Sequence, residues 1–434
     1  MRKKLIVISA DAMVAEDLEY LKTLPNYRKY LEGGALVKHV RSIYPSVTYP
    51  CHTTMVTGVY PDKHGITSNF DWKLSMENMP WTWFHSYVKT QDIFTAAKCA
   101  GYSTAAVFWP VTACHPDIDS LIAEYWTQGE GESLREAFAR AGSDERMLQV
   151  IERNQNLLVE RVHPMCDEFL VSCACDIIRE RKPDLLFLHP ANIDGYRHET
   201  GLFNSRVARG IEETDQFIGR IMEAAEQAGF AESVNLVLTS DHGQLEIKRT
   251  VNINVLFADK GLLQTDRQGK IVNWDVYCLS NGLSALVYLK DPSNKRLYQK
   301  TQELLYELRD EGVYGIGEVM TENEAKDREH LGGTFSFVIE TDGYTSFGAS
   351  AARPLVNTCD LSDYRYGKAT HGHLPEKGPQ PFFAAKGPDF RNGAVRDSAR
   401  LVDQAPTYAK ILGCSLPETD GQPMTELLKL AGTR

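Results

Sequence analysis

The sequence lacks long hydrophobic runs: no apolar stretch approaches the ~18 residues that a membrane-spanning helix needs. Near its start, the basic residues of MRKK are followed by LIVIS, about five apolar residues before Asp11 interrupts, which is too short for the core of a secretory signal. We therefore expect a cytoplasmic protein with no membrane partner.

An excess of positive charge and C-x-x-C pairs of cysteines are also missing. Lys and Arg total 47 against 58 Asp and Glu, which gives a formal net charge of -11. Proteins that bind nucleic-acid duplexes without sequence preference need clustered Lys and Arg to displace counterions, so that class is excluded. The 9 cysteines include no C-x-x-C pair, and an odd number gives no indication of a disulfide scaffold.

The chain does have the pattern of a large α/β protein. Its 434 residues are 43% hydrophobic and 24% charged, a globular profile. Four apolar runs are typical of buried parallel strands, and three of them end in Asp: LIVISADAM (5–13), STAAVFWP (103–110), DLLFLHPANID (184–194) and VNLVLTSDHG (234–243). Helical patterns at 92–100, 166–181 and 205–229 lie between these runs. Alternating strands and helices predict a doubly wound, mostly parallel sheet flanked by helices, with ligands at the carboxyl ends of the strands.

The pattern changes after Leu256. ALVYL, the helix-like NKRLYQKTQELLYELRDE, GIGEVMT and FSFVIET follow one another in a different alternation, which predicts a small α+β insertion over 252–347. FFAAKGPDF then resembles a return to the main sheet, and DQAPTYAKILG a closing helix. We thus expect a discontinuous core of 1–251 and 348–434.

Metal-capable side chains gather at the predicted strand ends. The candidate ligands are Asp11, Asp194, His198, Asp241, His242 and His371. On a helical turn, the i,i+4 spacing of Asp194 and His198 brings both side chains to one face, which suits one cation. Asp241 and His242 are adjacent, so at a strand end they diverge and suit two neighbouring metals or two sides of one. This mixed N/O set favours Zn²⁺, with Mn²⁺ or Fe as alternatives.

A threonine, Thr48, lies between Pro45 and Pro50 in YPSVTYPCHTTMVTGVYPDKHGITSN. Its hydroxyl is a poor nucleophile until a nearby cation lowers its pKa. Pro50 suits the first turn of a following helix, whose N-terminal amides would face an anion. On hydroxyl chemistry alone, Thr48 is equally an N-cap, and Ser46, Thr53, Thr54 or Thr57 would serve as well.

Taken in order, these segments resemble the type I phosphodiesterase/nucleotide pyrophosphatase group of the alkaline phosphatase superfamily. The matching pieces are VISADAM, PSVTYPCHTTMVTGVYPDKHGI, DGYRH, SDHG and THG, spread over most of the core. The resemblance implies an alkaline phosphatase-like core and two zinc ions. One would be held by Asp194, His198 and His371, and the other by Asp11, Asp241, His242 and Thr48.

The resemblance also implies a reaction of two in-line displacements. Thr48 would attack phosphorus to give a covalent phospho- or nucleotidyl-threonine, which water then hydrolyses. Asn69 occupies the family position whose side-chain amide holds a non-bridging phosphoryl oxygen, a contribution of about 3 kcal/mol by analogy with an oxyanion hole.

The aromatic residues near Thr48 depart from the family pattern or lack a motif. Members of the family commonly carry Phe after the nucleophile, whereas this chain has Tyr49, which would contact the nucleotide or leaving group or else pack beneath the loop. NFDW (69–72) and MPWTWFH (79–85) would either build a pocket for a base or close a hydrophobic patch, since stacking is worth ~1–3 kcal/mol per base.

Other activities stay open at this stage. A phosphonate hydrolase of the phosphonoacetate hydrolase type resembles the same arrangement of threonine and ligands, and a phosphate monoesterase or phosphomutase is a further alternative. Monoesterases need extra cationic groups near the phosphate, whereas an apolar pocket favours diesters. A non-catalytic binding protein predicts damage to the ligand set, which is complete here. We expect a small phosphodiester, nucleotide or phosphonate substrate, and the sequence predicts no oligomeric state.

Overall fold

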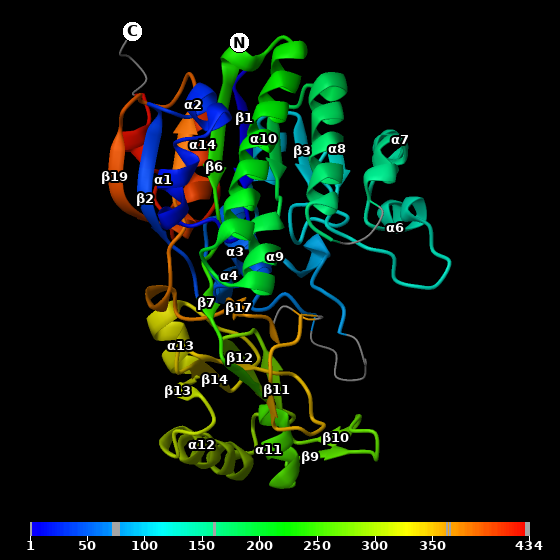
Figure 1. The fold of residues 1–434 in the computed structure, drawn as a ribbon, viewed down its shortest axis with the longest axis vertical. Coiled ribbons are helices and arrows are strands. Elements are labelled where there is room, and N and C mark those ends of the chain that lie inside the picture. The colour runs from blue at the N-terminus through cyan, green and yellow to red at the C-terminus, as the bar shows by residue number, and fades with distance from the viewer. Residues whose placement is uncertain (1, 72–78, 159–161, 362, 364–365, 430–434) are drawn as a thin grey trace.

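The fold is built on an eight-stranded sheet (Figure 1). The structure is a computed structural model that describes residues 2–71, 79–158, 162–361, 363 and 366–429. In spatial order the strands are β19 (Val395–Arg400), β2 (Ala35–Arg41), β18 (Phe383–Lys386), β6 (Val234–Thr239), β1 (Lys4–Ser9), β5 (Leu185–Leu188), β3 (Thr104–Val107) and β4 (Ser120–Ile122). All neighbours pair in parallel except β18, which is antiparallel to both β2 and β6. The predicted mostly parallel sheet is confirmed.

Helices cover both faces of this sheet because alternate strand residues are buried in opposite directions. Ile6 and Ile8 of β1 pack in the same apolar cluster as residues of α8 (Met165–Arg181) and α10 (Ser205–Gln227). Leu5 and Val7 belong to the cluster on the other face, with α3 (Thr48–Thr57), α5 (Ile93–Cys99) and α14 (Gln404–Leu412). The central strand is therefore buried on both sides, as a doubly wound fold requires.

The remaining elements of the core are short. The helices are α1 (Leu18–Leu21), α2 (Pro25–Tyr30), α4 (Pro61–His64), α6 (Leu134–Arg140), α7 (Glu145–Asn154) and α9 (Asn192–Thr200). The short strands β7 (Leu245–Glu246) and β17 (Ala369–Thr370) pair with each other, and β8 (Arg249–Val251) pairs with β15 (Thr345–Phe347) and β16 (Val356–Asn357). No helix in the described part of the chain is long and apolar enough to span a bilayer.

A second sheet lies below the core in Figure 1. It is antiparallel, in the order β11 (Val276–Ser280), β12 (Ser284–Leu289), β14 (Phe337–Thr341) and β13 (Ile316–Thr321). The segment also contains α11 (Ile253–Asp259), α12 (Lys295–Asp310), α13 (Glu322–Glu329) and the hairpin of β9 (Leu263–Thr265) and β10 (Ile271–Trp274). Its apolar residues form a separate core cluster, including Leu305 and Leu308 of α12. We call 252–347 the insertion; its limits as a domain stay a prediction.

Candidate metal centre and active site

The acidic and histidine side chains meet at the carboxyl ends of three adjacent parallel strands. Asp11 follows β1, and Asp241 and His242 follow β6. β5 leads into α9, which carries Asp194 and His198. Because β5, β1 and β6 are neighbours in parallel register, their ends lie at one edge of the sheet. The backbone N–H of Ala12 donates to Asp241 Oδ1 at 3.2 Å, which ties two of these ends together.

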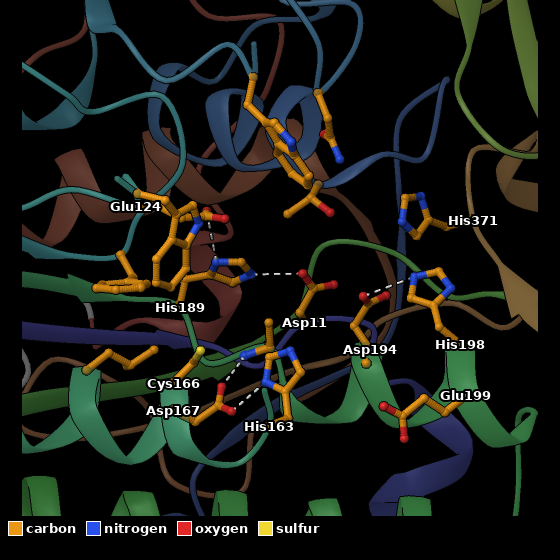
Figure 2. A pocket seen from close by; sticks show the side chains of 18 of the residues that line it. Asp11, Glu124, His163, Cys166, Asp167, His189, Asp194, His198, Glu199 and His371 are labelled. Carbon is orange, nitrogen blue, oxygen red and sulfur yellow. Dashed lines mark hydrogen bonds and ion pairs between the residues drawn. The ribbon is translucent and has the colours of Figure 1, made fainter. Parts of the chain in front are cut away.

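One candidate cation position is formed by Asp194, His198 and His371, whose ligand atoms all lie within 4.8 Å of one another. Asp194 and His198 are one turn apart on α9, with His198 Nε2 3.1 Å from Asp194 Oδ2. His198 Nδ1 donates to the carbonyl of Ala369 at 2.6 Å, which directs Nε2 toward the group. Figure 2 shows His198 and His371 on the same side of Asp194.

A second group adjoins the first and consists of Asp11, Asp194 and His242. His242 Nε2 lies 3.6 Å from Asp11 Oδ1 and 3.2 Å from Asp241 Oδ2. Asp194 belongs to both groups, so the two candidate cation positions are neighbours. The structure thus brings all six candidate ligands to one place, and their assignment to two zinc ions stays a prediction.

Thr48 enters this cluster from the start of α3. Its Oγ1 lies 3.3 Å from His242 Nε2, and its carbonyl accepts a hydrogen bond from His52 Nδ1 at 2.9 Å. Val47 is the N-cap of α3 and makes no side-chain cap, so Thr48 is the first helical residue rather than the cap. Its hydroxyl therefore points into the site instead of satisfying the helix.

Asn69 lies beside the nucleophile segment and is buried. Its Oδ1 accepts a hydrogen bond from the backbone N–H of Tyr49 at 2.8 Å. Because the oxygen of the carboxamide is held in this way, the amide nitrogen is on the opposite side, and Asn69 lines the same cavity as Thr48. This orientation suits a donor aimed at an anionic oxygen.

The charges of the site suit a divalent cation. Burial, together with the carboxylates of Asp241 and Asp194, raises the pKa of Asp11 well above its usual value. Burial opposes ionisation of Asp194 as well, but the ion pair with His198 outweighs it and lowers the Asp194 pKa. The pKa of His371 is lowered by burial and by His242, which keeps its imidazole neutral, the form that binds metals.

Two buried oxygens point to the same conclusion. Asp11 Oδ1 and Asp241 Oδ2 accept no hydrogen bond among the described residues, although His242 Nε2 lies near both. Buried carboxylate oxygens are normally paired or coordinate metals. The donor set of carboxylates and neutral imidazoles therefore fits borderline-soft cations such as Zn²⁺.

Several residues near the site were not predicted from the sequence. His189 Nε2 contacts Asp11 Oδ2 at 2.9 Å, and the other ring nitrogen lies 3.8 Å from Glu124 Oε2 (Figure 2). Gln244 Nε2 donates to the backbone carbonyl of Asp194 at 3.2 Å. His189 directly follows the buried run of β5, so the strand-end rule that selected Asp11 would have found it.

A cavity of about 520 Å³ opens from the cluster. Its wall away from the candidate ligands is formed by Phe108, Glu124, Trp126, His163, Cys166 and Leu170, with Trp81 also in the lining. Tyr49, in contrast, is fully buried, with its ring tilted by 60° against that of Trp81 at a centroid distance of 5.2 Å. It is absent from the described lining, so its contact with substrate stays a prediction. Trp72 of the predicted aromatic segment lies outside the described residues.

His163 in this wall has a carboxylate partner. Its Nδ1 lies 2.6 Å from Asp167 Oδ2, while Asp167 Oδ1 accepts the backbone N–H of Ala191 at 2.7 Å. Burial opposes the charged imidazolium, but the Asp167 carboxylate outweighs it and raises the pKa of His163. The cavity therefore combines aromatic surface with a histidine whose protonated form is favoured by a neighbouring carboxylate.

Comparison with known proteins identifies the family to which the chain belongs. A family model described as type I phosphodiesterase / nucleotide pyrophosphatase matches residues 5–362. The chain belongs to the type I phosphodiesterase/nucleotide pyrophosphatase family, a family of metal-dependent hydrolases of phosphoester bonds.

Individual relatives match part of the chain. It is 28% identical over 256 residues to ectonucleotide pyrophosphatase/phosphodiesterase family member 1 of Rattus norvegicus, covering 56% of this chain and 24% of that protein. It is 27% identical over 252 residues to venom phosphodiesterase of Naja atra, covering 55% and 26%. The chain therefore spans about a quarter of the length of these relatives.

Structural similarity covers more of the chain than these sequence matches do. The structure of murine ectonucleotide pyrophosphatase / phosphodiesterase 5 matches with a TM-score of 0.68 and 18% identity, covering 98% of this chain and 100% of that chain. An inactive variant of the same mouse protein in complex with AMP gives the same TM-score, covering 99% and 100%. This likeness confirms the alkaline phosphatase-like fold.

Proposed function

We propose that the chain is a two-zinc phosphodiesterase or nucleotide pyrophosphatase with Thr48 as its nucleophile. The observation that carries the proposal is the position of Thr48 Oγ1, 3.3 Å from His242 Nε2, at the edge of two adjoining Asp/His groups. The likeness to a protein solved with AMP supports a nucleotide-containing substrate. Mn²⁺ or Fe remains the alternative to zinc.

The residues of the site would form two cation positions for phosphoryl transfer. Asp194, His198 and His371 would hold one cation, and Asp11, Asp241 and His242, together with Thr48, the other. Bound zinc supplies Lewis acidity that lowers the pKa of the nucleophile and offsets the charge of the phosphoryl oxygens.

The chain's own groups orient the reaction. The Thr48 hydroxyl is directed into the cavity from the first residue of α3, and its attack on phosphorus forms an Oγ–P bond as the bond to the leaving group breaks. Asn69 places its amide N–H groups where a non-bridging oxygen gains charge. In the first displacement the hydroxyl proton leaves with the departing group. In the second, water hydrolyses the phosphothreonine ester: its oxygen stays on phosphorus and one of its protons re-forms the Thr48 hydroxyl.

A second candidate, a phosphonate hydrolase of the phosphonoacetate type, is favoured by one observation. His163, whose pKa is raised by the Asp167 carboxylate, lies on the cavity wall, and its protonated form would pair with a substrate carboxylate. With a pyrophosphate substrate, the protonated His163 imidazole would face the second phosphate. A diester substrate is favoured over a phosphonate because Phe108, Trp81 and Trp126 form much of the remaining cavity wall.

The test is hydrolysis of three p-nitrophenyl substrates by the zinc-loaded protein: the thymidine 5′-monophosphate diester, phenylphosphonate and phosphate monoester. We expect the diester to react fastest and Thr48→Ala to lower kcat by roughly 10³-fold or more. Thr57→Ala is the matched control, because the Thr57 hydroxyl bonds to Thr53 O at 2.8 Å within the same helix. Turnover of the monoester alone, or phosphate release from phosphonoacetate without diester hydrolysis, would replace the proposal with the corresponding alternative.

A further inference from the structure

The turn between β11 and β12 of the insertion reaches the catalytic edge of the core. It comprises Asn281, Gly282 and Leu283, and the backbone N–H of Asn281 donates to Ser284 O at 2.9 Å. Asn281, Leu283 and Ser284 are all buried. Three segments of the core, which carry Asn69, His371 and Thr48, contact this turn or the strand beside it.

The first contact holds the segment that precedes Asn69. Ser68 Oγ donates to Asn281 Oδ1 at 2.7 Å, and Asn281 Nδ2 donates to the carbonyl of Thr67 at 3.1 Å. One buried side chain therefore satisfies a donor and an acceptor of the two residues before Asn69. Removing it would leave Thr67 O and Ser68 Oγ without these partners in a buried place.

The second contact holds the segment of His371. The backbone N–H of Leu283 donates to His371 O at 2.9 Å, and Ser284 Oγ donates to Gly372 O at 2.6 Å. Gly282 has φ +84°, and a Cβ there would lie 2.6 Å from His371 O. The turn and the His371 segment are thus packed backbone against backbone, which only glycine at 282 permits.

The third contact extends the chain of bonds to the Thr48 segment. Gly372 N donates to Ser46 O at 2.9 Å, and Ser46 Oγ donates to His373 O at 2.8 Å. Glu340, which pairs with Ser284 across the insertion sheet, accepts from Tyr44 Oη at 3.0 Å and from the backbone N–H of Leu374 at 3.1 Å.

We infer that the turn Asn281–Ser284, with Glu340 beside it, is a brace that positions Thr48, Asn69 and His371 relative to one another. This inference rests on the proposed function, in which the insertion would hold the catalytic segments in position. None of the brace residues lines the cavity described above, so they act through the segments that they hold. Misplacing a reacting group by about 1 Å can cost on the order of 10²-fold in rate, so removing a brace contact is expected to affect kcat.

Asn281→Ala tests the brace, with Asn254→Ala as the matched control. Asn254 is equally buried and also belongs to the insertion, but its side chain bonds only to Cys278 and Ala349 among the hydrogen bonds described. We expect Asn281→Ala to lower kcat on the diester by about 10- to 100-fold with little change in KM. Asn254→Ala should lower the Tm without a comparable loss of kcat. Equal kcat values for the two variants at equal folded fraction would overturn the brace.

A second variant removes the same contact from the core side. Ser68→Ala deletes the 2.7 Å bond to Asn281 together with the 3.2 Å bond that Ser68 Oγ accepts from the backbone N–H of Phe70, and it leaves the insertion unchanged. If the brace acts through the Ser68–Asn281 bond, the double variant Ser68→Ala/Asn281→Ala loses less kcat than the two single losses multiplied together. Losses that add fully would contradict it. If Asn281→Ala does not fold, Ser68→Ala still tests whether the contact between Ser68 and Asn281 affects kcat.

Zinc titration against a chelating dye separates the brace from the proposed reaction. Ser284→Ala removes the bond to Gly372, next to His371, and should weaken zinc binding by about 10-fold or more, in line with the effect of groups that orient metal ligands. Unchanged zinc affinity would count against the brace. A wild-type protein that binds zinc but hydrolyses none of the substrates would overturn the proposed function and leave the zinc titration to decide on the brace.

Discussion

The carboxyl group of Glu340 gives a stability prediction whose size follows from its surroundings. Glu340 is fully buried in β14 and contacts Tyr44 Oη, the backbone N–H of Leu374 and Lys377 Nζ, the last at 3.0 Å. Burial, only partly offset by Lys377, raises its pKa from 4.5 to about 7. The perturbation is Glu340→Gln, which keeps the shape and the hydrogen-bonding capacity but cannot ionise.

The sign follows from proton binding. Between pH 4.5 and about 7 the folded protein holds a proton on Glu340 that the unfolded chain has released, so the free energy of unfolding falls as pH rises through this window. The Gln variant lacks this pH-dependent contribution to the free energy of unfolding. At 1.36 kcal/mol per pKa unit, the wild type should lose about 2–3 kcal/mol relative to Glu340→Gln between about pH 5 and pH 8.

Urea unfolding of both proteins across that pH range measures the difference. Other titrating groups contribute equally to both proteins and cancel when one curve is subtracted from the other. A difference that stays constant with pH, or that changes in favour of the wild type as pH rises, would refute the reasoning about burial of Glu340.

Two further predictions concern the metal centre and its support. Arg197→Ala should lower the free energy of unfolding by about 3–5 kcal/mol in chemical denaturation, because Arg197 Nη2 lies 2.7 and 2.8 Å from the two oxygens of buried Asp17, which would be left unpaired. Arg353→Ala, which removes an exposed pair with Asp259 at 2.7 Å, should cost at most ~1 kcal/mol, and equal losses for the two variants would contradict this reasoning. Chelation of zinc should lower the Tm, since a cation at 100 times its Kd stabilises the folded state by about 2.7 kcal/mol. This decrease in Tm should be smaller in Asp11→Asn, because the variant lacks the charged carboxylate oxygen Oδ1 as a ligand. An equal decrease in Tm for the variant and the wild type would place the cation elsewhere.

The parts of the fold that follow local patterns could be predicted from the sequence. The apolar run of 234–243 became β6 because a strand buried on both faces needs no polar alternation. The apolar periodicity of 205–229 became α10, capped by the Asn204 side chain. The spacing of Asp194 and His198 indicated one helical turn, and α9 places them on that turn.

What could not be predicted depends on contacts between distant residues. Ser68 and Asn281 are 213 positions apart, and no local pattern of turn or hydroxyl residues indicates that they meet. Glu124 lies 3.8 Å from His189, although it follows β4, which is two strands away from β5 in the sheet. Likewise, Asp194 lies in both Asp/His groups, which depends on the relative positions of three strand ends rather than on spacing within one segment.

The central claim, covalent attack by Thr48, is tested most directly by the stereochemical course at phosphorus. A thymidine phosphorothioate diester of single configuration at phosphorus is hydrolysed by the zinc-loaded protein in water enriched in oxygen-18, and the configuration of the product is determined. Each in-line displacement inverts phosphorus, so two displacements through a threonine ester predict overall retention. Overall inversion would mean that water attacks phosphorus directly and that Thr48 is not the nucleophile.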